Sequence, residues 1–336
     1  MSTINQTDRQ IVKAVEGAGT KLARAREAIG AVIFGQAPVV EQALITLLCG
    51  GHGLLVGVPG LAKTKLIDTL GTVLGLDTKR IQFTPDLMPP DILGSEVLEE
   101  SASGKRSFRF IKGPVFTQLL MADEINRASP RTQAALLQAM QEYHVTIAGQ
   151  RHDLPRPFHV LATQNPLEQE GTYPLPEAQL DRFMMQIDVP YPDIDSERRM
   201  LFETTGIEQV QPEHTLSVEE LSEIQRLVRR IPVGESVVEA ILSLVRAARP
   251  ASADGNRGES VITKWISWGP GPRASQALML GVRARALIDG RFAPSIDDVA
   301  ALAEPVLQHR MALTFAARAE GETVSGIIGK LAERLR

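Results

Sequence analysis

Cysteine is nearly absent from this sequence of 336 residues, because Cys49 is the only one. A single cysteine excludes a disulfide bond within the chain, and a structural zinc site with one cysteine ligand would be unusual. Proteins of reducing compartments use cysteine in this way, so we expect a cytoplasmic protein.

Long apolar runs and a strong net charge are also missing. The first ten residues, MSTINQTDRQ, lack the apolar core of a signal peptide. No run elsewhere approaches the roughly 20 residues that span a membrane. The formal net charge is only −4, whereas nucleic-acid-binding domains usually carry a positive excess. We therefore expect neither a membrane span nor a nucleic-acid partner.

The chain is long enough for roughly two domains of about 150 residues. Apolar residues recur every three or four positions from Ile11 to Ile29, which predicts a leading helix that ends before Gly35. A second helical pattern runs from Val40 to Leu48. After Pro192 helical spacing returns and strand patterns fade, so we expect an all-helical second domain, with an exposed loop at 250–258.

Between Gly53 and about Pro190, short apolar runs alternate with helical patterns, which is typical of a parallel sheet covered by helices. The predicted buried strands are 54–56, 119–122 and 159–163. Ser129 followed by Pro130 predicts the start of a helix. Two segments, 96–111 and 143–154, carry apolar and β-branched residues around a Gly-containing turn and predict inserted β-hairpins.

The sequence GVPGLAKT follows the first predicted strand and precedes a helical pattern, which is the context of a phosphate-binding loop. Gly57 and Gly60 allow backbone N–H groups to point at phosphate oxygens. Lys63 is expected to pair with the β- and γ-phosphates and Thr64 to ligate magnesium. Ala62 stands where the loop formula has Gly; alanine is tolerated there without a penalty if the local backbone is ordinary helical, with a negative φ.

Carboxylates and an amide follow two other predicted strands. Asp123 and Glu124 end the strand at 119–122, where open α/β sheets bind ligands. Asp123 is expected to hold magnesium and Glu124 to act as the general base on water. An acidic helix cap remains the alternative. Asn165 ends the strand at 159–163 and can hydrogen-bond a phosphate or the attacking water, although an Asn-Pro pair alone indicates only a turn.

The ordered set GVPGLAKT, LLMADEINRASPRTQ, ATQNP, LDRF and GPRAS resembles the MoxR family of AAA+ ATPases over essentially the whole chain. The resemblance implies an α/β P-loop AAA+ domain, a parallel sheet with helices on both faces and two inserted β-hairpins, plus a smaller all-α lid. It divides the chain into a helix with an adenine-side linker at 1–36, the α/β domain at 37–205 and the lid at 206–336. Family members carry alanine before the loop lysine, as here.

The resemblance also implies a homo-oligomer, usually a hexameric ring, that binds ATP or ADP with Mg²⁺ at a site shared between subunits. Arg182 matches the arginine finger, Arg273 the sensor-two arginine and Asn165 sensor one. A salt bridge to Asp181 or Glu177 is the ordinary alternative for Arg182. The predicted catalytic residues are Glu124, Asn165, Arg182 and Arg273; the predicted nucleotide-binding residues are Gly35, Gln36, Gly57, Val58, Pro59, Gly60, Leu61, Ala62, Lys63, Thr64, Lys65 and Asp123; the predicted metal ligands are Thr64 and Asp123.

The function that we expect is an ATP-hydrolysing motor that remodels protein clients with a partner that carries a von Willebrand A domain. A chelatase-type motor subunit, a nucleic-acid motor and a scaffold that binds ATP without hydrolysis are the alternatives. The basic residues Lys105, Arg106 and Arg109 of the first hairpin either engage substrate or are simply solvated. His52 has no visible partner for catalysis and is expected to be structural.

Overall fold

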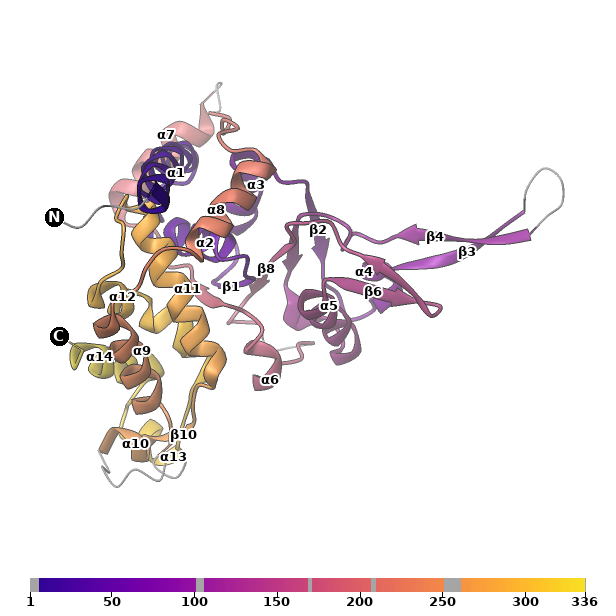
Figure 1. Ribbon diagram of the computed structural model, residues 1–336. Coiled ribbons are helices and arrows are strands. Elements are labelled where there is room, and N and C mark those ends of the chain that lie inside the picture. Colours follow the sequence, from indigo (N-terminus) through magenta and orange to yellow (C-terminus); the bar gives the residue numbers. More distant parts are fainter. Residues whose placement is uncertain (1–5, 101–105, 169–170, 207–209, 251–260, 336) are drawn as a thin grey trace.

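The computed structural model describes residues 6–100, 106–168, 171–206, 210–250 and 261–335. A sheet-centred body and a mainly helical part lie side by side, and a long two-stranded arm projects from the sheet-centred body (Figure 1). The helices are α1 Gln6–Gly30, α2 Ala37–Leu48, α3 Lys63–Val73, α4 Pro89–Leu93, α5 Pro130–Glu142, α6 Glu177–Leu180, α7 Ile194–Thr205, α8 Val218–Val228, α9 Glu235–Ala247, α10 Val261–Trp265, α11 Pro272–Ile288, α12 Ile296–Leu307, α13 Phe315–Ala319 and α14 Val324–Glu333, with 3₁₀ turns η1 Ile125–Arg127 and η2 Gln308–Arg310.

The central sheet has five parallel strands in the order β2-β5-β8-β1-β9. Its strands are β1 Gly53–Val56, β2 Thr78–Gln82, β5 Leu119–Asp123, β8 His159–Gln164 and β9 Met185–Asp188. The three predicted strands are confirmed as its centre. The two edge strands, β2 and β9, were not predicted. Edge strands are only half covered, so β2 buries a single side chain, Ile81, and lacks an apolar run.

Helices cover both faces of the sheet, as predicted. Successive side chains of a strand point to opposite faces. Leu55 of β1 therefore packs in one core with α1, α2, α3 and the helical part, whereas Leu54 packs in a second core with α5 and the hairpins. Ser129 caps α5 by accepting a hydrogen bond from the Thr132 N–H, so the predicted helix start is confirmed.

Both predicted hairpins are present: β3 Gly94–Glu100 pairs with β4 Arg106–Lys112, and β6 His144–Ile147 pairs with β7 Gln150–Asp153. The first forms the projecting arm. Phe110 at its base stacks on His152 of the second hairpin, with ring centroids 4.0 Å apart.

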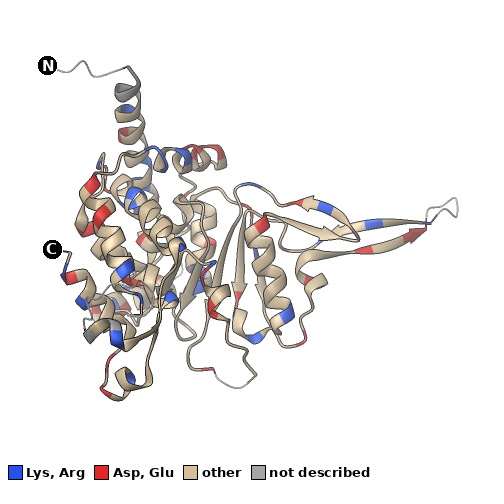
Figure 2. Ribbon diagram, turned by 60° about the horizontal axis from the view of Figure 1, so that its bottom comes forward, with Lys and Arg blue, Asp and Glu red and all other residues tan. Residues whose placement is uncertain are grey.

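The basic residues of the arm are paired within it. Arg106 lies 3.1 Å from Glu100, and Arg109 lies 3.0 Å from Glu99. The acidic residues of the arm lie on β3 and the basic residues on β4, so its two strands carry opposite charge (Figure 2). Lys105 and the expected turn lie outside the described residues.

From α7 to α14 the described residues form mainly helices, with one short two-stranded sheet. The short strand β10, Ile266–Trp268, pairs antiparallel with β11, Ala312–Leu313. The prediction of an all-helical domain was therefore wrong in this detail, because strands of three and two residues are too short to show a period of two. Apart from Pro250, the expected loop at 250–258 lies outside the described residues.

Helix α1 contacts both parts of the molecule. It packs against α2 and α3 beside the sheet and against α8 and α11 of the helical part. Lys21 of α1 forms an ion pair of 2.6 Å with Glu220 of α8. The predicted domain boundaries after residues 36 and 205 stay predictions. None of the helices that the structure describes is both long and apolar enough to cross a membrane.

Candidate active site

The phosphate-binding loop lies between β1 and α3, as predicted. Lys63, the first residue of α3, folds its side chain back over the loop, and its Nζ donates to the backbone carbonyls of Gly57 and Val58, each at 2.7 Å. Burial lowers the pKa of the Lys63 ammonium, and the negative charges of Asp123 and Glu124 oppose that shift. The lysine is therefore held inside the loop and faces the two carboxylates.

The backbone of Ala62 does not meet the condition under which alanine carries no penalty. Its φ is 54° and its ψ 20°, which is the left-handed region rather than an ordinary helical conformation. Ala62 is the residue before α3, where the loop must turn sharply into the helix. The left-handed conformation costs an L-residue roughly 1–2 kcal/mol relative to glycine. The alanine thus stores strain in the loop.

We expect Ala62→Gly to raise the free energy of unfolding by up to about 1 kcal/mol, because glycine adopts this conformation without strain but loses more entropy on folding. Urea denaturation of the nucleotide-free protein measures the change. Ala134→Gly, at an exposed position inside α5, serves as the control, and that change should destabilise by about 1 kcal/mol. A loss of stability in Ala62→Gly would contradict the strain.

The carboxylates Asp123 and Glu124 stand at the end of β5, as predicted. The Thr163 hydroxyl connects them, because it donates to Asp123 Oδ1 at 2.5 Å and accepts from the Glu124 N–H at 2.9 Å. Glu124 itself has φ 55°, so the chain turns sharply after the strand and separates the two side chains. The ends of β5 and β8 thus fix both carboxylates.

Two polar partners of these carboxylates come from β2 and were missed. Arg80 donates to Asp123 Oδ2 at 2.6 Å and to the Gln82 side chain at 2.8 Å. Gln82 in turn donates to Glu124 Oε2 at 2.7 Å. A signal was available, because Ile81 is flanked by polar residues, the pattern of an exposed edge strand.

A cavity of about 400 Å³ opens over the loop. Besides the loop from Pro59 to Lys65, it is lined by Asp123, Glu124, Thr163 and Asn165. The oxygen ligands of Thr64 and Asp123 suit Mg²⁺, and Lys63 suits phosphate, so the lining fits a metal-bound polyphosphate. Asn165 accepts from the Leu167 N–H through Oδ1, which orients its amide.

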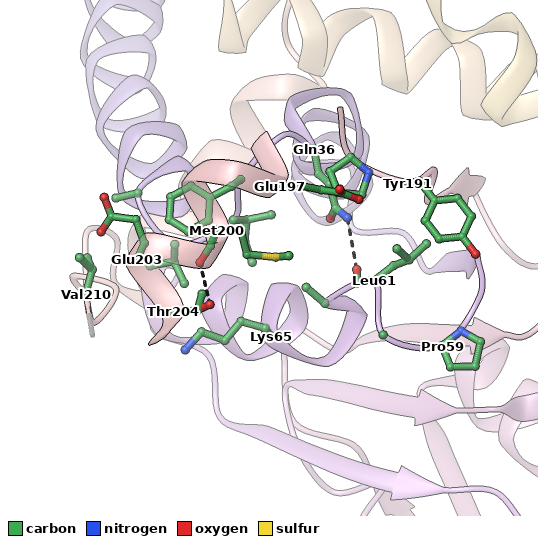
Figure 3. A pocket seen from close by; sticks show the side chains of 17 residues that line it. Gln36, Pro59, Leu61, Lys65, Tyr191, Glu197, Met200, Glu203, Thr204 and Val210 are labelled. Atoms are coloured by element: carbon green, nitrogen blue, oxygen red, sulfur yellow. Dashed lines mark hydrogen bonds between the residues drawn. The ribbon is translucent and has the colours of Figure 1, made fainter. Parts of the chain in front are cut away.

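A second cavity, of about 490 Å³, adjoins the first along the loop and shares its residues from Pro59 to Ala62. Its walls include apolar side chains such as Val32 and Ile33, and α7 contributes Met200 and Thr204 (Figure 3). Its shape and apolar lining suit a planar base next to a phosphate site.

Gln36 lies at the wall of this second cavity. Its Nε2 donates to the Leu61 carbonyl at 3.2 Å, as the dashed line in Figure 3 marks. Its Oε1 is buried and has no partner among the residues that the structure describes. Gly35 does not line either cavity; its φ of +69° and the close approach of Ser196 explain why glycine stands there.

Arg182 and Arg273 lie elsewhere. They line a third cavity, of about 310 Å³, together with Asp181, Arg229 and Arg310. Neither lines the two cavities along the loop. Arg182 donates to Gln141 at 3.1 Å, and among the described residues it has no ion pair, so the alternative of a salt bridge to Asp181 or Glu177 is not observed.

His52 lines the same third cavity but is occupied by the backbone. Its Nδ1 accepts from the Val160 N–H at 2.9 Å, and its Nε2 donates to the Met140 carbonyl at 3.2 Å. Burial and the nearby His159 lower the pKa of His52 to about 3, so the ring is neutral. The prediction of a structural histidine is confirmed.

Comparisons with known proteins agree with this geometry. The family model of the "ATPase family associated with various cellular activities (AAA)" matches residues 52–185, and that of the "AAA lid domain" matches residues 258–331. A crystal structure from Cytophaga hutchinsonii, of a protein assigned as an ATPase, superposes with a TM-score of 0.88 at 36% identity and covers 99% of both chains. The helical part after the sheet is therefore an AAA+ lid.

Several curated relatives share most of their length with this chain. Chaperone MoxR1 of Mycobacterium tuberculosis is 41% identical over 299 residues, which cover 89% of this chain and 78% of the relative. YeaC of Bacillus subtilis, an uncharacterized protein, is 38% identical over 92% of both chains. Protein MoxR of Paracoccus denitrificans is 31% identical over 86% of this chain and 88% of the relative. A phosphate-binding loop, paired carboxylates, an AAA+ lid and these relatives together show that the chain belongs to the MoxR family of AAA+ ATPases.

Proposed function

We propose that this ATPase is a remodelling motor for protein clients whose active site is completed by the neighbouring subunit of a ring. One observation carries the shared site: the cavity over the loop contains Lys63, Glu124 and Asn165 but no arginine among the described residues, while Arg182 and Arg273 line a separate cavity. Phosphoryl transfer gains most from an arginine at the transferred phosphate. A neighbouring subunit supplies this arginine if the cavity that contains its Arg182 and Arg273 faces the phosphate-binding loop of the first subunit.

The roles of the residues follow from their places. Backbone N–H groups of the loop and Lys63 hold the phosphates, and Thr64 and Asp123 hold Mg²⁺, which neutralises phosphate charge when it is bound. Glu124 takes the proton of the attacking water, and Gln82 orients the carboxylate that does so. Asn165 presents its amide to the same water or to the γ-phosphate.

Dependence on assembly tests the shared site. We expect ATP turnover per subunit to rise cooperatively with protein concentration, in step with particle mass measured by light scattering on the same samples. Turnover per subunit that stays constant while the particle mass changes would mean a self-contained site. A hexameric mass at the plateau would agree with the ring that we propose.

The unpartnered oxygen of Gln36 supports recognition of adenine. Gln36 Nε2 is already bound to the Leu61 carbonyl, so Oε1, which has no partner among the described residues, is left to accept a hydrogen bond. Adenine offers an amino group at its six-position, whereas guanine offers a carbonyl there. A buried acceptor facing a carbonyl is costly.

We therefore expect Gln36→Leu to weaken ATP binding by about fivefold and to leave GTP binding nearly unchanged, because one neutral hydrogen bond contributes about 1 kcal/mol. Fluorescence titration with labelled ATP and GTP measures both constants. Gln138→Leu is a matched control, since Gln138 lies on α5 and its side chain bonds to Glu142, remote from the loop. An equal loss of affinity for ATP and GTP would mean that Gln36 supports the conformation of the loop and does not distinguish the bases.

The client and the partner are proposed from the family resemblance. A partner that carries a von Willebrand A domain would join this motor to its client. Motion of the lid against the sheet during turnover would supply the work. Capture of such a partner by the ATP-bound Glu124→Gln form, and its release with ADP, is the test. Salt-sensitive DNA binding that accelerates turnover would favour the nucleic-acid motor instead.

A further inference from the structure

Side chains of the 3₁₀ turn η2 in the lid form hydrogen bonds with the backbone that follows Arg182. Gln308 Nε2 donates to the Gln186 carbonyl at 3.1 Å, and His309 Nε2 donates to the Phe183 carbonyl at 3.1 Å. Arg310 donates to the carbonyls of Phe183 at 2.7 Å and Met184 at 3.1 Å. Three consecutive side chains of the lid thus bind the backbone at the start of β9. We call this set of contacts the η2 clamp.

Arg310 is the centre of the η2 clamp. It is only 2% exposed, and its Nε donates to Asp181 Oδ1 at 2.8 Å. Burial lowers the pKa of Arg310, and the Asp181 carboxylate opposes that shift. Its NH1 also donates to the Val306 carbonyl, at 2.5 Å. A buried guanidinium is tolerated only when its donors are satisfied, so these contacts define a precise geometry.

The η2 clamp binds the residues before and after Arg182 in the chain. Asp181 precedes Arg182 and Phe183 follows it, and Arg310 binds each of them. The second carboxylate oxygen of Asp181, Oδ2, lies 3.6 Å from Arg273 NH1. The side chain of Arg182, by contrast, is bound by the neutral Gln141. The pair of the buried Arg310 and the partly exposed Asp181 therefore lies next to Arg182 in the chain and next to Arg273 in space.

We propose that the η2 clamp positions Arg182 and Arg273 so that they reach the site of the neighbouring subunit. Arg310 is then a positioning residue, which touches no nucleotide and acts through the backbone around Arg182. The inference rests on the shared site proposed above. The turn η2 belongs to the lid, and Arg182 belongs to the sheet domain. The position of the lid in one subunit therefore determines where Arg182 of that subunit lies relative to the active site of its neighbour.

A simpler role would be to hold the lid on the sheet domain. Two variants separate the two roles. Arg310→Met roughly keeps the volume but removes the donors of Asp181 and of the Phe183 and Met184 carbonyls, so it should lower thermal stability. The double change Asp181→Asn with Arg310→Met also removes the carboxylate that Arg310 had neutralised. The double variant should therefore regain part of the stability but not the hydrogen bonds to the Phe183 and Met184 carbonyls.

For the double variant we expect a melting temperature above that of Arg310→Met, ATP affinity within about twofold of wild type and turnover lower by about 100-fold, because small misplacements of catalytic groups cost that much. Scanning calorimetry, fluorescence titration and phosphate release measure the three quantities. If turnover recovered together with the melting temperature, the pair would be structural only and the inference would be overturned. Full turnover in Arg310→Met would overturn it as well.

Mixed assemblies identify the side of the interface that is damaged. The double variant retains an intact loop, and Glu124→Gln subunits retain intact arginines. We expect their mixture to regain turnover that neither has alone, with co-assembly verified by purification through a tag on one of them. Arg182→Ala mixed with Glu124→Gln is the control. If turnover recovers only in the control mixture, the positioning role of the η2 clamp is overturned and the shared site is retained. If turnover recovers in neither mixture, both proposals are overturned.

Discussion

Replacement of Glu124 by Gln lowers ATP turnover by about 10²- to 10⁴-fold, the usual contribution of a general base, and leaves ATP affinity within a few-fold of wild type. Glutamine keeps the size and can still accept from Gln82, which binds Glu124 at 2.7 Å. It cannot take a proton from water. Phosphate release under saturating ATP, together with titration of labelled ATP, measures the two effects separately.

Glu142→Gln is the matched control for this change. Glu142 ends α5, is exposed and accepts a hydrogen bond from Gln138, remote from the loop. Its turnover should equal that of wild type. Unchanged turnover in Glu124→Gln would assign the proton transfer to another group, and Asp123 would be the next to test. Loss of ATP binding would instead indicate that Glu124 supports the loop.

Arg182→Ala should lower turnover by about 10³- to 10⁵-fold, which is the effect of an arginine finger supplied by a partner. Binding of ATP should persist, because Arg182 does not line either cavity along the loop. The remaining turnover should no longer depend on protein concentration, even though light scattering still shows assembly. Arg182→Lys keeps the charge without the planar fork and should lie between the two.

Arg131→Ala controls for the loss of one positive charge, since Arg131 is an exposed residue of α5. We expect it to behave as wild type. Should Arg182→Ala retain full turnover, Arg273, which lines the same cavity, would be left as the arginine that completes the site. If Arg182→Ala failed to assemble, its rescue by Glu124→Gln subunits could not occur, and its role would be in the interface.

The centre of the fold was predictable because buried parallel strands read as apolar runs. The strands β1, β5 and β8 have neighbours on both sides, and their ends locate the loop, Asp123 and Asn165 at one edge of the sheet. The edge strand β2 contains no apolar run, so neither the strand nor its residues Arg80 and Gln82 were predicted. Residues at strand ends were thus predicted where the strand itself was recognised.

Other features of the site depend on backbone geometry or on distant parts of the chain. The sign of φ at Ala62 follows from how the loop enters α3, which residue types alone do not reveal. The η2 clamp joins Arg310 to Asp181 across 129 positions of sequence. No local pattern signals such a contact, and an arginine near a helix end usually indicates only a charged surface.

The β3–β4 arm acts as a lever. Its strands of seven residues extend roughly 24 Å at about 3.4 Å per residue. At its base Phe110 stacks on His152, which joins the arm to the second hairpin. A rotation of about 10° at the base would displace the far end by roughly 4 Å, a step longer than one residue of extended chain. The length of the two strands alone would thus turn a small rotation at the base into a displacement of about one residue at their far end.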